Sequence, residues 1–292
     1  MVGRNTPILI QPKLIKGMSY VIGLRDESFI VMDGGAYNEE DMQCLYDLMA
    51  KKTPANQKII IAAWMFTHPH YDHIELAFNF IQKYANEVDI QSFMYQFPDC
   101  EKLGELYPGE ERVIEDVRLL EKSIASCCPD ANICTIHTGE KYTFQGAEIE
   151  ILFTVEDAEP QKLRSYNDTS AAWRVTFDNG TTFLVLGDCM SNTCKQIADK
   201  YGDYIKSDIL QPAHHGLLGG DKGLYQLVDP QICFWATSEE RFLGNWPNEK
   251  FHYCLGEGPC DYNAWIRDSN IREREHYHHS VTTELIMDWS SK

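Results

Sequence analysis

Apolar and polar positions form a regular pattern along the first part of the chain. Two β-rich runs, Ser19 to Leu24 and Ser28 to Met32, are separated by the polar Arg25-Asp26-Glu27 and followed by Asp33-Gly34-Gly35, which predicts a hairpin and then a tight turn. Between Glu39 and Lys51 apolar residues recur at three- and four-residue spacing, which predicts an amphipathic helix. The chain therefore begins with strands and then adds a helix.

Strands and helices alternate through the rest of the chain. Ile59 to Phe66 is a continuous apolar run typical of a buried strand. The same reasoning predicts helices at Ile74 to Tyr84, Glu110 to Ala125 and Ser191 to Lys200, and strands at Val88 to Met94, Ile133 to His137, Ala147 to Phe153, Ala171 to Phe177, Thr181 to Leu186, Ser207 to Leu210, Ile232 to Trp235 and Val281 to Met287. This alternation predicts an α/β (α+β) protein in which helices cover sheets. No long linker is present, and Thr154 to Tyr166 is the only seam, so we expect one domain over residues 1–292.

Composition narrows the class of protein. Hydrophobic residues make up 43% of the chain, which is typical of a folded globular protein. The ten cysteines are scattered, contain no Cys-x-x-Cys pair and follow no signal-peptide pattern, so we expect reduced thiols and a cytoplasmic location. No apolar run is long enough to cross a bilayer, and a membrane partner is not expected.

Charge narrows the class of substrate. Lysine and arginine total 26 against 44 acidic residues, and the formal net charge of −18 disfavours a long nucleic acid as a partner. A small phosphorylated molecule remains compatible, because bound cations reverse the local field of a site. We therefore expect a small-molecule substrate, and the sequence leaves the oligomeric state open.

Four residues that can bind metals fall within His68-Pro69-His70-Tyr71-Asp72-His73, directly after the apolar run that ends at Phe66. His68 and His70 are two residues apart in an extended segment, so they point to one side and can share one metal. Asp72 and His73 come where the chain turns into the next helix, so they can serve a second cation. A histidine-rich surface loop is the alternative interpretation, and the density of ligand types after a buried strand disfavours it.

Two further strand ends carry metal-binding residues. In Leu186-Gly187-Asp188 the glycine lets the backbone turn so that Asp188 projects from the end of the strand, although such an aspartate taken alone is more often a helix N-cap. In Pro212-Ala213-His214-His215-Gly216 two histidines follow a strand. We assign His214 to the metal and give His215 a catalytic or substrate-side role, and the exchanged assignment stays open.

The order of these motifs, starting from Asp33-Gly34-Gly35, resembles that of the metallo-β-lactamase superfamily over roughly residues 18–290. Within it, Asn167-Asp168-Thr169-Ser170 and the His-His-Gly motif are similar to the competence-type DNA-uptake proteins and the bacterial phosphorylcholine esterases. The resemblance implies a four-layer αββα sandwich with two divalent metal ions at the sheet edges, Asp188 bridging them and His214 completing the second site. Zinc suits these donors best, and manganese or iron would be accepted by the same set.

The chain also departs from the family pattern. Many members supply a third histidine to the first metal where this chain has Asn167-Asp168, so that site is either weaker or completed by Asp168, and the choice between Asn167 and Asp168 stays open. The subgroup commonly has a serine after His-His-Gly and a later His-Pro, where this chain has Leu217 and Asn245-Trp246-Pro247. His137 lies in an earlier predicted strand and is not assigned to the site.

The predicted function is metal-dependent hydrolysis of a small phosphodiester or phosphorylated substrate. Two cations lower the pKa of a bridging water, and Asp72 would orient it and accept its proton. Alternatives are a carboxyl-type hydrolase acting on a lactone, thioester or β-lactam, an iron-dependent oxidoreductase, and a non-catalytic metal-binding protein. Candidate substrate-binding residues, each with an ordinary turn, capping or exposed-loop role as the alternative, are Asn167, Asp168, Thr169, Ser170, His278 and His279.

Overall fold

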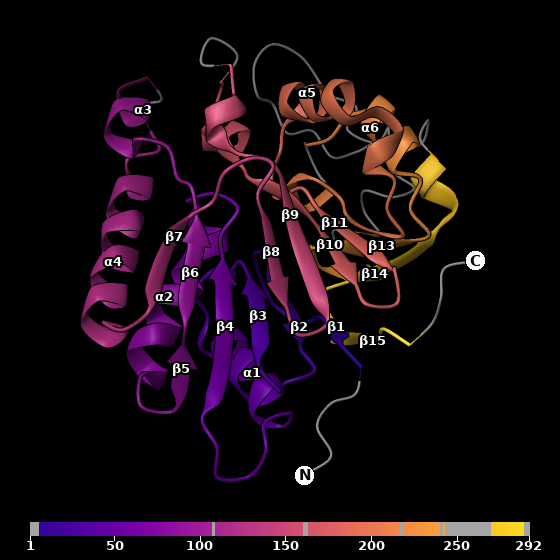
Figure 1. Cartoon of the computed structure of the whole chain (residues 1–292). Coiled ribbons are helices and arrows are strands. Elements are labelled where there is room, and N and C mark those ends of the chain that lie inside the picture. The colour runs from indigo at the N-terminus through magenta and orange to yellow at the C-terminus, as the bar shows by residue number, and fades with distance from the viewer. Residues whose placement is uncertain are drawn as a thin grey trace.

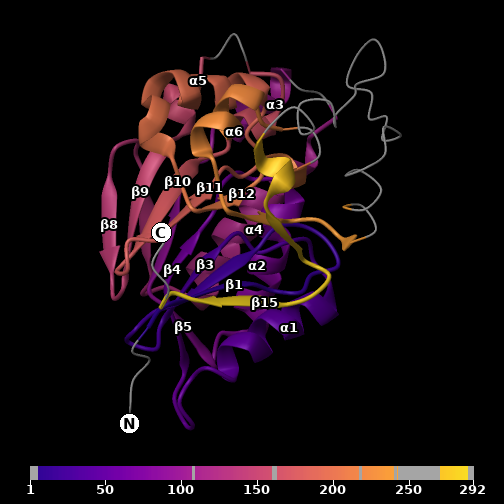
Figure 2. The same cartoon turned by 90° about the vertical axis from the view of Figure 1, so that its right-hand side faces the viewer.

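Two β-sheets lie at the centre of the molecule, and helices cover the outer face of each (Figures 1 and 2). The structure is a computed structural model that describes residues 6–106, 109–159, 163–216, 219–239, 242 and 270–288. These four layers form the αββα sandwich that the sequence predicts. In the part of the chain described, no helix is long and apolar enough to cross a membrane.

The first sheet has the order β15-β1-β2-β3-β4-β6-β7, and β5 also pairs with β4. Its central strands β3 and β4 are parallel, while β1, β2 and β15 are antiparallel to their neighbours. The strands are β1 (Ile8–Gln11), β2 (Tyr20–Gly23), β3 (Phe29–Met32), β4 (Ile59–Met65), β5 (Val88–Ile90), β6 (Ser92–Tyr95), β7 (Asn132–Thr135) and β15 (Thr283–Ile286).

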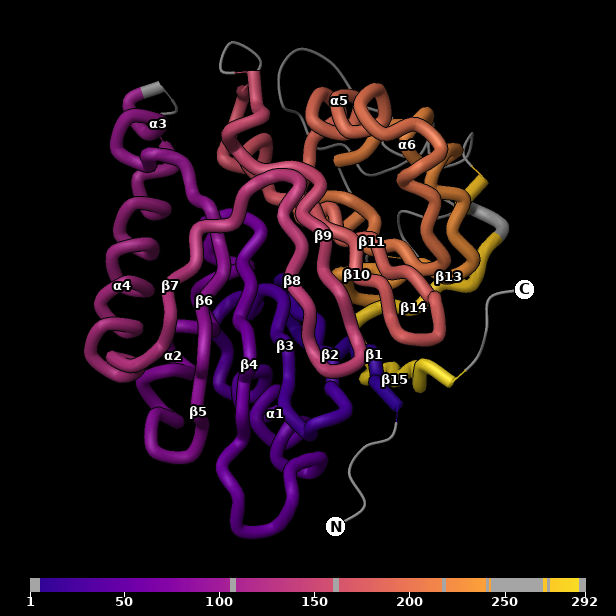
Figure 3. The backbone as a smooth tube through the Cα atoms, in the orientation of Figure 1, coloured from indigo at the N-terminus to yellow at the C-terminus, as the bar shows by residue number. Residues whose placement is uncertain are grey.

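The second sheet has the order β14-β13-β12-β11-β10-β9-β8, and its strands β11 to β14 are parallel. The chain completes most of the first sheet before it builds the second, as the colour along the tube in Figure 3 shows, and only β15 returns to pair with β1. The strands are β8 (Lys141–Phe144), β9 (Ala147–Phe153), β10 (Ala172–Phe177), β11 (Thr182–Val185), β12 (Ile209–Gln211), β13 (Ile232–Trp235) and β14 (Glu275–His278).

Helices pack on the outer faces through apolar stripes. Residues of α1, α2 and α4 form one core with the first sheet, and residues of α5 and α6 form another with the second. The α-helices are α1 (Glu39–Ala50), α2 (Tyr71–Tyr84), α3 (Cys100–Leu106), α4 (Arg112–Cys127), α5 (Ser191–Tyr201) and α6 (Lys222–Val228), and short 3-10 helices are η1 (Val155–Asp157), η3 (Tyr166–Thr169), η4 (Gly202–Ile205), η5 (His214–Gly216) and η6 (Asn270–Glu273).

Alternation along each strand divides its residues between two cores. In β2, Tyr20 and Ile22 belong to the core between the sheets, whereas Val21 belongs to the core beneath the helices. Successive side chains of a strand point to opposite faces, so a strand covered on both faces must be apolar throughout. This requirement explains the continuous apolar runs in the sequence.

Two buried polar side chains connect the sheets across the central core. The hydroxyl of Tyr20 on β2 donates a hydrogen bond of 2.9 Å to the carbonyl of Phe234 on β13. The amide of Gln11 on β1 donates one of 2.8 Å to the carbonyl of Trp235. Because both residues are almost fully buried, each hydrogen bond satisfies a polar group that would otherwise be costly to bury.

Most of the predicted elements are confirmed, with shifted ends. The hairpin is β2 and β3, and the long helix from Glu39 is α1. The expected strand from Val88 to Met94 is divided into β5 and β6, and the helix expected from Ile74 begins at Tyr71, so Asp72 and His73 lie in its first turn. The short elements β1, β8, β14, α3 and α6 were not predicted, because so few residues show no clear periodicity.

We predict that Tyr20→Phe lowers the free energy of unfolding by about 1 to 3 kcal/mol, because the carbonyl of Phe234 loses a buried donor. Chemical denaturation measures this change. Tyr37→Phe is the matched control, since Tyr37 is 47% exposed and its hydroxyl contacts only the exposed Glu39. Equal losses in the two variants would show that the hydrogen bond between the sheets contributes nothing.

Candidate metal centre

Four chain segments that each follow a strand meet at one edge of the sandwich. They come after β3, β4, β11 and β12 and carry Asp33, the histidines at 68–73, Asp188 and the histidines at 214–215. In sheets built from parallel strands, the carboxyl ends form a crevice where ligands bind. The strand order therefore brings together residues that are far apart in the sequence.

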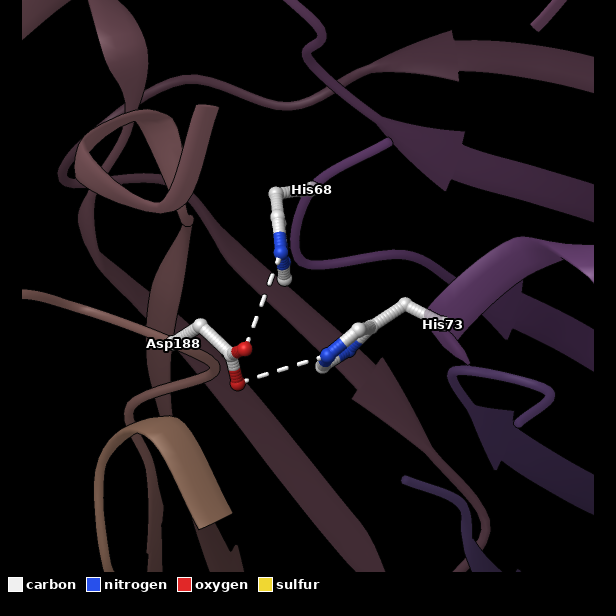
Figure 4. Close-up of side chains that lie close together, drawn as sticks. All are labelled: His68, His73 and Asp188. Carbon is white, nitrogen blue, oxygen red and sulfur yellow. Dashed lines mark ion pairs between the residues drawn. The ribbon is translucent and has the colours of Figure 1, made fainter. Parts of the chain in front are cut away.

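The first group of side chains that could hold a metal ion consists of His68, His73 and Asp188, which point toward one another in Figure 4. His73 Nε2 lies 3.3 Å from Asp188 Oδ1, and His68 Nε2 lies 3.9 Å from Asp188 Oδ2. All three residues are buried, and their ligand atoms lie within 4.8 Å of one another. His70 extends this group, because its Nδ1 lies 3.0 Å from His68 Nε2.

The second group consists of Asp72, His73 and His215, again with ligand atoms within 4.8 Å of one another. His215 Nε2 lies 3.3 Å from Asp72 Oδ2 and 3.4 Å from Asp188 Oδ2. Its other ring nitrogen, Nδ1, donates a hydrogen bond of 2.7 Å to the carbonyl of Ala236. That bond fixes the ring so that Nε2 faces the two carboxylates.

His214 and His215 are arranged differently from the sequence-based assignment. His214 Nε2 lies 3.7 Å from Asp188 Oδ2, but His214 is not part of either group of three found among the described residues. The geometry therefore favours His215 at the second position and leaves His214 beside Asp188, with 15% of its side chain exposed.

Asp33 and Thr67 support the centre, and the sequence analysis gave neither residue a role there. The Asp33 carboxylate accepts hydrogen bonds of 2.8 Å from the Thr67 amide, the Thr67 hydroxyl and His73 Nδ1. A ligating histidine commonly donates its remote N–H to a carboxylate, which orients the ring. The signal available in the sequence was an aspartate directly after a buried strand.

Gly187 allows Asp188 to approach the histidine loop. Its φ is +54°, and a Cβ added there would lie 2.8 Å from the Cβ of Thr67. Any larger residue would push against Thr67, which is hydrogen-bonded to Asp33. The glycine expected to end the strand thus also sets the spacing between Asp188 and the histidines.

Opposite charges set the protonation of the buried groups. Burial by itself lowers the pKa of His73 and of His215, but neighbouring carboxylates outweigh it, and the pKa of His215 rises to about 10 while that of His73 rises well above its usual value. Burial would raise the pKa of Asp188, yet His215, His73 and His214 hold it well below its usual value. Burial lowers the pKa of His214 to about 4.

The donor set fits divalent cations. Four buried atoms of the centre have no hydrogen-bond partner among the described residues: His73 Nε2, Asp188 Oδ1, His214 Nδ1 and His215 Nε2. An unpartnered buried polar atom is costly unless a ligand satisfies it. Imidazole and carboxylate donors suit zinc, manganese and iron.

The Asn167-Asp168-Thr169-Ser170 segment overlaps η3, and Ser170, which follows η3, contacts the backbone of Asp188. Ser170 Oγ accepts the Asp188 amide at 3.1 Å, and Thr169 Oγ1 donates to the carbonyl of Tyr166 at 2.7 Å, so both hydroxyls support the local backbone. Asn167 Oδ1 and Asp168 Oδ1 are buried without a hydrogen-bond partner among the described residues.

The remaining candidates lie farther along the sheet edge or outside the described residues. His278 ends β14, with Nε2 at 3.9 Å from Glu239, and the backbone amide of His279 donates to the carbonyl of Thr237. Cys189, next to Asp188 in the sequence, is fully buried in the core beneath α5 and α6 and packs there among apolar residues. Leu217 and Asn245-Trp246-Pro247 lie outside the described residues.

Comparison with solved structures identifies the architecture. The metallo-beta-lactamase fold protein YhfI from Bacillus subtilis superposes with a TM-score of 0.52 at 12% sequence identity, over 97% of this chain and 100% of YhfI. CmlA, a diiron beta-hydroxylase from Streptomyces venezuelae, superposes with a TM-score of 0.52 at 13% identity, over 97% of this chain but 54% of CmlA, so this chain spans about half its length. No family model and no curated protein sequence matches the chain.

The chain therefore has the metallo-β-lactamase fold, which confirms the fold predicted from the sequence motifs. At this level of identity the two neighbours establish the architecture alone. The narrower resemblance to competence-type proteins and phosphorylcholine esterases stays a prediction.

We predict that metal binding releases protons at neutral pH. His73 and His215 have raised pKa values in the metal-free protein, so they are protonated at pH 7 and must lose about two protons to bind metal. Apparent affinity should therefore rise with pH from 7 toward 10. Zinc titration by calorimetry in two buffers of different ionisation enthalpy measures the release, and heats that do not depend on the buffer would contradict it.

Proposed function

We propose that this chain is a metal-dependent hydrolase that holds two divalent cations, zinc being preferred, and cleaves a small phosphodiester or phosphorylated substrate. The observation that carries the proposal is the convergence of His68, His73, His215 and Asp188, whose potential ligand atoms lie close together in the buried centre. We also propose that residues 1–292 act as one cytoplasmic domain. Free thiols throughout the described ranges and a core shared by both sheets support this.

We assign the first cation to His68 and His70 and the second to Asp72, His73 and His215, with Asp188 between them. His68 Nε2 and His70 Nδ1 are 3.0 Å apart, so a cation about 2.0 to 2.1 Å from each nitrogen fits. His215 is preferred to His214 because its Nδ1 is anchored on the carbonyl of Ala236 while its Nε2 has no hydrogen-bond partner.

A pair of such cations lowers the pKa of water and supplies hydroxide near neutral pH. Asp72 is the residue that would orient the attacking water and accept its proton, because its carboxylate lies 3.3 Å from His215 Nε2 and its side chain is 19% exposed. We assign this role to Asp72 and not to Asp188, because Asp188 is almost fully buried.

The acidic shell favours a small substrate over a polymer. A net charge of −18 repels a long phosphate backbone, whereas cations at the centre attract a single phosphoryl group. Asn167 is the residue of η3 that we assign to donate a hydrogen bond to a substrate phosphate. The hydroxyls of Thr169 and Ser170 already take part in hydrogen bonds with the protein backbone. His278 and His279, near the end of β14, are candidates for the outer wall of the substrate site.

Oxidation chemistry at iron is the second candidate. The structural neighbour CmlA is a diiron beta-hydroxylase on the same fold, and imidazole and carboxylate donors accept iron as well as zinc. Elemental analysis of the isolated protein separates the two candidates. Iron with a visible absorption band would favour the oxidoreductase, whereas zinc or manganese favours the hydrolase.

We predict metal-dependent turnover of an activated phosphodiester, bis(p-nitrophenyl) phosphate, by protein loaded with zinc or manganese. The same samples are to be assayed with a lactone, a thioester and a β-lactam, because the same hydroxide attacks a carbonyl carbon. Faster turnover of a carboxyl substrate would replace the phosphodiester assignment. Absence of turnover on all four classes with fully loaded protein would reject the hydrolase.

We further predict different metal contents in two variants. Asp188→Ala should weaken the binding of both cations, because Asp188 lies against His68, His73 and His215. His68→Ala should mainly weaken the binding of the first cation. Metal content after dialysis, measured by elemental analysis, tests this. Asp178→Ala, an exposed aspartate paired with Arg25, is the control, and wild-type metal content in Asp188→Ala would contradict the bridging role.

A further inference from the structure

We propose that Glu110 is a positioning residue that holds His70 in the orientation needed to bind the first cation. Glu110 lies in the loop before α4 and belongs to none of the sequence motifs that predict the metal centre. The inference rests on the first metal site of the proposed function. It names the residue by which this chain stabilises that site without the third histidine found in many metallo-β-lactamase-like proteins.

The two ring nitrogens of His70 face different partners. Nδ1 lies 3.0 Å from His68 Nε2, on the side of the candidate cation, and Nε2 lies 3.2 Å from Glu110 Oε2. A carboxylate oxygen accepts hydrogen bonds, so of the two neutral forms of His70 it favours the one that carries its proton on Nε2. That form leaves the lone pair of Nδ1 free for metal.

Two other histidines of the centre are held in the same way. His73 Nδ1 is hydrogen-bonded to Asp33 at 2.8 Å, and His215 Nδ1 to the carbonyl of Ala236 at 2.7 Å. In each case the remote nitrogen is fixed and the near nitrogen faces the site, which is the arrangement that tunes a metal ligand. Glu110 gives His70 the equivalent partner, but from the loop that leads into α4 instead of a strand end.

His70 needs such a partner more than the buried histidines do. Its side chain is 18% exposed, whereas those of His68 and His73 are fully buried. The ring of Tyr166 lies 6.0 Å from that of His70 and limits its movement on one side. Glu110 supplies the one directional contact to His70 Nε2 among the described residues.

The start of α4 is fixed against α2, which places Glu110. The carbonyl of Glu110 accepts the amide of Val113 at 3.0 Å in the first turn of the helix. Arg112 pairs with Glu75 of α2 at 2.6 Å, and its guanidinium lies 4.5 Å from the ring centre of Tyr71, which stands between His70 and Asp72 in the sequence. Packing of α4 on α2 thus determines where the carboxylate lies.

Zinc titration against a chromophoric chelator tests the proposal, because it yields the two affinities separately. Glu110→Ala should lower the affinity of the first site about 10- to 100-fold and leave the second unchanged, the usual effect of removing such a partner. Glu110→Gln should lose less zinc affinity at the first site, because its amide oxygen can still accept a hydrogen bond from His70 Nε2. Glu115→Gln removes one charge from the exposed face of α4, the helix that follows Glu110. Its two zinc affinities should equal those of the wild type.

A second measurement reports the proton on His70 directly. Long-range proton–nitrogen spectra of histidine-labelled, metal-free protein should show His70 protonated on Nε2 in the wild type and in Glu110→Gln, and a mixture of the two neutral forms in Glu110→Ala. A residue that merely supports the fold would change stability without changing this ratio.

The outcomes separate this proposal from the function on which it rests. Wild-type protein that binds no zinc would contradict the metal centre itself. Suppose that the wild-type protein binds two zinc ions. If Glu110→Ala then has the same affinity as the wild type at each site, or an unchanged His70 spectrum, only the role of Glu110 is overturned. Equal weakening of both sites would overturn it as well, because the carboxylate contacts His70 alone among the candidate ligands described.

Discussion

The hydrogen bonds of the buried Asp33 carboxylate are the interactions on which the rest of the centre depends. Asp33 follows β3, and its three hydrogen bonds reach the end of β4 through Thr67 and the first turn of α2 through His73. Burial raises the pKa of Asp33, while the neighbouring His73 opposes that rise. A carboxylate in the core is tolerated because every one of these contacts satisfies it. The same contacts fix the loop that carries the metal-binding histidines.

Charge balance explains why the centre is suited to cations. Asp33, Asp72 and Asp188 lie close together in a strongly acidic chain, and His73 and His215, whose pKa values are raised, offset only part of their negative charge. At the proposed metal centre, a bound cation would take the place of those protons beside the same carboxylates. Folding of the protein and binding of metal would then use one set of interactions.

The sequence motifs predicted the fold and pointed to the strand ends whose histidines and aspartates meet in the structure, because buried parallel strands and short loops leave a strong local signal. Three features depend on contacts between distant segments and left no such signal. The pairing of Glu110 with His70 spans forty positions, and the choice between His214 and His215 depends on a carbonyl at Ala236. The role of Asp33 is visible only once β3 and β4 are adjacent. Short elements such as β1 form because a neighbouring strand pairs with them.

The His-His-Gly turn shows how backbone strain serves the site. His214, His215 and Gly216 all have left-handed φ angles of +52°, +57° and +75°, and this conformation costs an ordinary residue about 1 to 2 kcal/mol. The turn is held by the His214 amide, which donates to the carbonyl of Gly187, and by Trp235, whose ring occupies the place of a Cβ at Gly216. Because the backbone turns so tightly, two successive histidines both approach Asp188. One of them is then anchored on Ala236 and directed at the candidate second metal, while the other stays at the partly exposed edge of the centre.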